Sequence, residues 1–191
     1  MATSASSSSF SSSTRTGQAV GIAAGWGALL GVAAAMVMAA YAMIAAATYQ
    51  NTGFFTPLYH IASTVIAPDT MMTSVERAGA GSLFYFSFGP AVLGAVIHIM
   101  VGAVYGALFA VIARVTALHG LPVLTMAGIV WGLLVFAIST WIGLPLAAAI
   151  FGGGEPIRDM AGMVGYPTFI AEHLLFGAAL GMMLAWRTGR R

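Results

Sequence analysis

The chain has 191 residues, of which 60% are hydrophobic and only 6% are charged, and its net charge is +2 at pH 7. A soluble domain carries about 25% charged residues, so a surface of this composition would not stay dissolved in water. The absence of cysteine excludes disulfides, thiolate metal sites and cysteine nucleophiles. The small, scattered net charge does not indicate a nucleic-acid partner.

Long stretches of the chain contain no Asp, Glu, Lys or Arg. Such charge-free intervals run from Arg15 to Asp69, from Arg77 to Arg114 and from Arg114 to Glu155. A helix needs roughly 20 predominantly apolar residues to cross a bilayer, and each interval can hold at least one. The sequence therefore predicts an all-α integral membrane protein with four transmembrane helices, and the lipid bilayer is its first partner.

The N-terminal residues 1–17 are rich in serine and threonine, with one aromatic residue and no acid. They hold too little apolar area to fold alone, so we expect a polar tail. A Ser-rich, acid-poor stretch is also typical of an organellar transit peptide, and this alternative stays open. The first span is expected at residues 20–48. It is too long for a signal-peptide core of about 7–15 residues and should remain as an anchor.

The connection over residues 49–88 has mixed polarity. Pro57 can open a short helix, and Asp69 or Thr70 can cap a second one that reaches Arg77. Both are expected to lie at the membrane interface rather than to cross the bilayer.

The other three spans are separated by glycine- and proline-rich breaks. Gly120, Leu121 and Pro122 make a tight turn between the second and third spans. Pro145 should bend the last turns of the third span. The expected spans are residues 88–117, 123–151 and 166–186. A single transmembrane domain, residues 18–187, then precedes a short basic tail at residues 188–191.

The arginines indicate an orientation. With four spans, both termini share one side of the membrane with the turn near residue 120. That side carries five arginines: Arg15, Arg114, Arg187, Arg190 and Arg191. The opposite side carries Arg77 and Arg158 alone. Basic residues accumulate on the cytoplasmic side, so both termini are expected in the cytoplasm. The use of arginine for every basic residue favours a GC-rich bacterium and hence a bacterial inner membrane.

A sequence pattern occurs in both the second and the fourth span. Residues 98–110 and residues 173–185 both fit His-x3-Gly-Ala-x2-Gly-x3-Ala. This match predicts two tandem helical hairpins in a parallel repeat, related by an axis along the membrane normal. Glycines four residues apart let two helices approach closely in lipid. The glycine pairs of the two motifs are therefore the expected helix-packing residues, with spans two and four crossing there: Gly102, Gly106, Gly177 and Gly181.

The two copies of this motif resemble a loose group of small four-helix bacterial inner-membrane proteins of uncharacterised function. The resemblance covers residues 98–110 and 173–185, and the remainder of the chain matches poorly. It implies a fold and no activity.

His98 and His173 each stand four residues before a motif glycine, so they share its helix face. An ionisable group at membrane depth is a candidate functional residue. Three interpretations remain open. The imidazoles hydrogen-bond neighbouring helices, or they bind a metal ion together with Glu172 and His60, or they are axial ligands of a b-type haem. A porphyrin would force the helices apart, whereas the glycines favour backbone contact.

No catalytic motif stands out, so no enzymatic activity and no cofactor are expected. The leading hypothesis is a non-catalytic accessory subunit that packs against larger membrane-protein subunits of a bacterial complex, respiratory or photosynthetic. The alternative is a small transporter, or a metal- or haem-binding membrane protein, that uses His98 and His173.

Overall fold

The computed structural model describes the backbone of residues 6–189 and the side chains of residues 17–189. In this part of the chain every regular element is helical. The elements in order are α1 (Ser6–Ala47), α2 (Thr56–Ala62), α3 (Asp69–Gly79), α4 (Phe88–Val115), α5 (Leu121–Ile138), the π-helix η1 (Ser139–Gly143), α6 (Leu144–Phe151), α7 (Gly154–Arg158), α8 (Met160–Val164) and α9 (Tyr166–Gly189).

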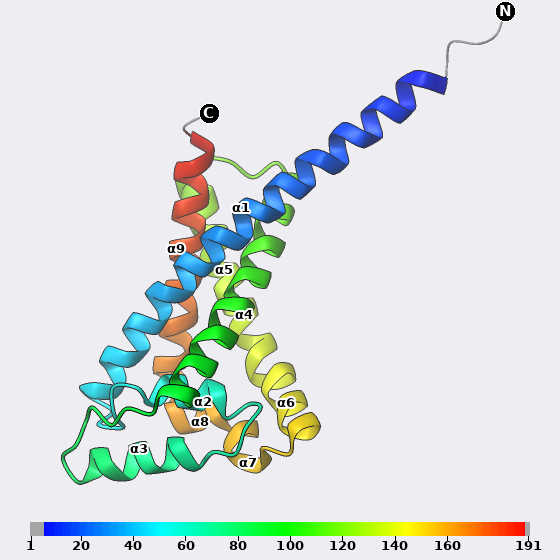
Figure 1. The fold of residues 1–191 in the computed structure, drawn as a ribbon. Coiled ribbons are helices and arrows are strands. Elements are labelled where there is room, and N and C mark those ends of the chain that lie inside the picture. The colour runs from blue at the N-terminus through cyan, green and yellow to red at the C-terminus, as the bar shows by residue number, and fades with distance from the viewer. Residues whose placement is uncertain (1–5, 190–191) are drawn as a thin grey trace, which may run out of the picture.

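Four helical segments of the described chain are long and apolar enough to cross a membrane, as the sequence predicts. They are Gly17–Ala47, Phe88–Val115, Leu121–Phe151 and Tyr166–Gly189, each within three residues of the expected bounds. Both ends of the described chain lie at one end of the bundle, and α2, α3, α7 and α8 lie at the other (Figure 1). Helix α1 already begins at Ser6, inside the segment expected to be a polar tail, while residues 1–5 lie outside the described part. An apolar helix can propagate into polar residues because each added residue gains one backbone hydrogen bond.

Glycines bring the helices together in two pairs. A Cβ atom on Gly31 of α1 would collide with the carbonyl oxygen of Gly102 on α4. A Cβ atom on Gly177 of α9 would likewise collide with the carbonyl oxygen of Gly128 on α5. Helix α1 therefore packs on α4 and α5 packs on α9. The expected crossing of spans two and four at these glycines is wrong, because glycine pairs in spans one and three provide the partner surfaces.

Helix α9 is the most enclosed of the spans. In its most apolar window 61% of the residues are buried, against 22–28% in the other three spans. It contacts both α5 and α1, so it joins one helix pair to the other. Thr168, Glu172 and His173 on α9 are therefore placed in the protein interior rather than in lipid.

The third span is interrupted by a π-helical turn, η1, where the sequence predicts a bend. Pro145 follows two residues after this turn and has no backbone N–H to donate to the preceding turn. The N–H of Leu144 instead bonds the carbonyl of Ser139, five residues back. Such single π turns are frequent at functional sites. This one lies at the depth of the site described below.

The two predicted short helices in the first connection are present as α2 and α3. Pro57 stands in the first turn of α2, as expected, whereas α3 is preceded by Pro68 and begins at Asp69 without a side-chain cap. The Thr56 hydroxyl hydrogen-bonds the Ser74 hydroxyl at 2.8 Å and ties α2 to α3. Helix α2 also packs on α4, where the Leu58 carbonyl occupies the space beside Gly94. The connection is thus a fixed part of the bundle.

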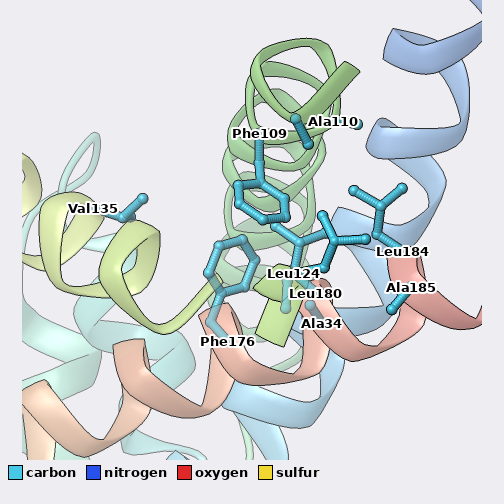
Figure 2. Close-up of a cluster of buried hydrophobic side chains, with 11 residues drawn as sticks. Ala34, Phe109, Ala110, Leu124, Val135, Phe176, Leu180, Leu184 and Ala185 are labelled. Atoms are coloured by element: carbon cyan, nitrogen blue, oxygen red, sulfur yellow. The ribbon is translucent and has the colours of Figure 1, made fainter. Parts of the chain in front are cut away.

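A cluster of buried apolar side chains fills the half of the bundle nearer the termini. Phe109 of α4 and Phe176 of α9 point toward one another at its centre, with Leu180 fully buried beside them (Figure 2). Val135 of α5 belongs to the same cluster. A smaller cavity of about 250 Å³, which Trp26 lines among other residues, also lies in this half.

The four-span arrangement makes a direct prediction about sidedness. Because the chain has no cysteine, the labelling of a single introduced cysteine is measured without background from other thiols. A membrane-impermeant maleimide should label His119→Cys and Thr188→Cys from one side of sealed vesicles and Glu76→Cys from the other. All three positions are exposed. Labelling of Glu76→Cys from the same side as His119→Cys would contradict the topology.

Candidate functional site

A cavity of about 540 Å³ lies between the two helix pairs. Val135 and Phe176 line it and also belong to the buried cluster, so the cluster closes it toward the termini. Residues of α2 and α8, including Pro57 and Met160, line the opposite end. The site is therefore a pocket in the half of the bundle that lies away from the termini.

The cavity brings together all four titratable residues that the sequence singles out. His60 comes from α2, His98 from α4, and Glu172 and His173 from α9. Glu172 lies next to His173 but points about 100° away from it around the helix. It is nevertheless only 7% exposed, since α9 is enclosed on more than one face.

Backbone carbonyls fix how the two span histidines present their ring nitrogens. Nε2 of His98 donates to the carbonyl oxygen of Ala35 on α1 at 2.8 Å. Nδ1 of His173 donates to the carbonyl oxygen of Phe169, one turn earlier, at 2.7 Å. A carbonyl can only accept, so in a neutral imidazole the other nitrogen carries a lone pair. His98 Nδ1 and His173 Nε2 are therefore hydrogen-bond acceptors without a protein partner in the described chain.

The Glu172 carboxyl also lacks a protein partner. It makes no hydrogen bond or ion pair with the described residues, although its side chain is buried. The hydroxyls of Tyr41 and Tyr49 hydrogen-bond to each other at 3.2 Å and not to this carboxyl. Tyr49 also hydrogen-bonds the hydroxyl of Thr168 at 3.0 Å. A buried acid without a donor is costly unless something other than protein satisfies it.

His60 is also buried, with 8% of its surface exposed. Its Nε2 atom is buried and has no hydrogen-bond partner. Removal of the ring from water penalises the charged form, which lowers the pKa of His60 from 6.5 to about 4. A buried polar atom left unpaired costs about 1–3 kcal/mol, so the imidazole of His60 lowers the stability of the fold.

The pKa of His60 predicts a pH effect on stability. Because its pKa is lower in the folded protein, the unfolded chain takes up the proton first as the pH falls. Folding is then weakened by about 3 kcal/mol between pH 6.5 and pH 4. The variant His60→Leu should lack this part of the acid sensitivity and be at least as stable at pH 7.

Unfolding of both proteins in detergent at a series of pH values measures the effect, with the exposed His119→Leu as control. An unchanged pH profile in His60→Leu would contradict the burial of the imidazole.

Several residues of the site were missed by the sequence analysis. Ser139, in the π-helical turn, lines the cavity, and the hydroxyl of the adjacent Thr140 is buried without a partner. Pro145 was the available signal, since a proline within a span marks a local change in helical hydrogen bonding. Four methionines also line the cavity: Met38, Met43, Met160 and Met163.

The four titratable residues are spread around the cavity rather than gathered at one point. In the described part of the chain no three His, Asp or Glu side chains lie close enough together to hold a metal ion. For a haem, His98 would have to give up the bond between its Nε2 atom and Ala35 to ligate through that atom. The geometry instead offers separate polar groups around an apolar chamber.

These features define the class of the molecule as a helical, multi-pass membrane protein with a mostly apolar cavity that a few polar groups face. Comparison of the chain with protein-family models, with curated proteins and with solved structures finds no match.

Proposed function

We propose that this membrane protein binds a small organic molecule in the cavity between its two helix pairs, as a small transporter or a ligand-binding membrane protein. The observation that carries the proposal is that Glu172, His98 and His173 face one cavity with polar atoms that the protein leaves unpaired. Ionisable groups are expensive inside a membrane and mark substrate pathways.

The size and lining of the cavity support this class of function. Small-molecule sites measure about 300–1,000 Å³ and combine a mostly apolar wall with a few placed polar groups. The volume of about 540 Å³ lies within that range. Phe169 and Leu144 are among the apolar lining residues, and Ser139 is among the polar ones.

The cellular setting is part of the proposal. We place the protein in a bacterial inner membrane, because every basic residue is an arginine. Both termini are placed in the cytoplasm, because five of the seven arginines belong to that side. The cavity then lies in the outer half of the bilayer. The matching glycine contacts, Gly31 with Gly102 and Gly128 with Gly177, support two tandem hairpins in a parallel repeat.

The competing class is a non-catalytic accessory subunit, in which the histidines only hold helices together. Replacement of both His98 and His173 with phenylalanine separates the two classes. We expect the wild-type protein, extracted gently from its native membrane, to release a small organic molecule when it is denatured. The double variant should lose it, because both acceptor nitrogens are removed.

The variant His119→Phe is the matched control, since His119 is exposed and outside the cavity. Retention of the molecule by the control and loss by a still-folded double variant would support the proposal. Co-purification of both proteins with the same larger subunits, and with no small molecule, would instead favour the accessory subunit.

A further inference from the structure

Building on the proposed function, we infer that the cavity selects apolar amines in their protonated form, with Glu172 as the counter-charge and the two span histidines as acceptors. The ligand would be an organic ammonium with an aromatic or aliphatic body. Three independent features of the cavity carry the inference: the direction of its hydrogen bonds, its charge and the nature of its wall.

The unpaired groups that His98, His173 and an ionised Glu172 present to the site are acceptors. His98 and His173 each use their N–H on a backbone carbonyl, which leaves lone pairs on His98 Nδ1 and His173 Nε2. An ionised Glu172 adds only acceptor oxygens. Two other polar lining groups are already engaged as donors. The Gln50 amide donates to the Val164 carbonyl, and the Thr64 hydroxyl donates to the Ile61 carbonyl. An ammonium group, which carries donors and no acceptor, is the complement of such a site.

The charge of the cavity points the same way. Glu172 is the one acidic residue that lines it, and no arginine with a described side chain does so. The described arginine side chains lie elsewhere. Arg77 stacks on Tyr85, with its guanidinium carbon 4.8 Å from the ring centre, and Arg187 stacks on Trp26 at 4.1 Å. A cation supplied by a ligand would thus be the counter-ion of Glu172, and an anionic ligand would be repelled.

The wall of the cavity suits a desolvated cation. Tyr105, Phe169 and Phe176 contribute aromatic rings, and four methionines contribute thioethers. The face of an aromatic ring attracts an ammonium group, and more strongly when water is excluded. Methionine adapts its shape to different apolar bodies. This lining favours a ligand with a hydrophobic body attached to its charged head.

The test compares three probes of nearly equal shape: naphthylmethylammonium, naphthylmethanol and naphthoate. Their binding is measured by fluorescence in vesicles of zwitterionic lipid that contain the full chain. We expect the ammonium to bind at least tenfold more tightly than the alcohol, and naphthoate to bind most weakly. Glu172→Gln should weaken the binding of the ammonium at least tenfold and leave the binding of the alcohol unchanged.

The control variant is Glu76→Gln, which neutralises an exposed acid on α3 away from the cavity. It should bind all three probes as the wild type does, and thermal unfolding verifies that both variants are folded. Equal binding of the alcohol or the carboxylate would overturn the choice of ligand class and leave the cavity as a binding site. No binding of any probe would also overturn it. The molecule released from the native protein decides the proposed function separately.

Discussion

Replacing Gly31 with alanine is expected to destabilise the bundle by about 1–3 kcal/mol, whereas the same change at Gly25 is expected to stabilise it slightly. A Cβ atom at Gly31 would meet the backbone of Gly102 and would lie 2.9 Å from the Cα atom of Gly106. Backbone cannot rotate away, so α1 and α4 would have to separate, with the cost typical of overpacking. In lipid, this close packing is a main source of helix association.

Gly25 is a matched control because it lies on the same helix with no atom within 4 Å of its added Cβ. There alanine gains about 0.5–1 kcal/mol through its lower conformational entropy in the unfolded chain. Unfolding by denaturing detergent, followed by circular dichroism, measures both variants. Equal effects at Gly31 and Gly25 would show that α1 does not pack on α4 through this face.

The second large effect is expected when the cavity is filled. Ala39 of α1 lines the cavity, and its neighbour Ala40 is exposed on the lipid side of the same helix. Ala39→Phe should lower the amount of bound small molecule at least tenfold. The melting temperature should stay level or rise, because the ring takes up empty volume. Stability gained at the expense of activity is the signature of a filled functional site.

Ala40→Phe carries the same added volume on the outside and should retain both the molecule and the wild-type melting temperature. Mass spectrometry of the denatured protein measures the retained molecule, and differential scanning fluorimetry measures melting. If Ala39→Phe kept the molecule at wild-type levels, the cavity would not be the binding site.

The four spans and the short helices of the first connection could be predicted from sequence because their causes are local. A charge-free run of apolar residues defines a span wherever it packs, as in Phe88–Val115. Pro57 starts α2 through its own fixed backbone angle. These elements depend on properties of the residues themselves and not on their neighbours in space.

The pairing of the helices depends on which faces meet, and this is not local. The sequence contains the pairs Gly27 with Gly31 and Gly128 with Gly132 at the same spacing as the chosen motif. These pairs are the true partners of the motif glycines, and the spacing alone would have identified them as candidates. Because several helices carry glycine pairs at the same spacing, only the tertiary packing determines which pairs contact one another.

The titratable residues of the candidate site could be singled out from the sequence, but the cavity that they line could not. His98 and His173 stand out because ionisable residues are rare at membrane depth. Glu172 and His60 were linked to them only as candidate metal ligands. Their burial follows from the enclosure of α9 on more than one face and from the fold of α2 over the cavity. Neither property can be predicted from the residues that flank Glu172 or His60 in the sequence.

The most direct measurement is native mass spectrometry of the protein released from its own membrane. We expect the 19.6 kDa chain to carry one small organic molecule, which the double variant of His98 and His173 loses. A bare chain, or a chain found only with larger subunits and no small molecule, would contradict a ligand-binding cavity.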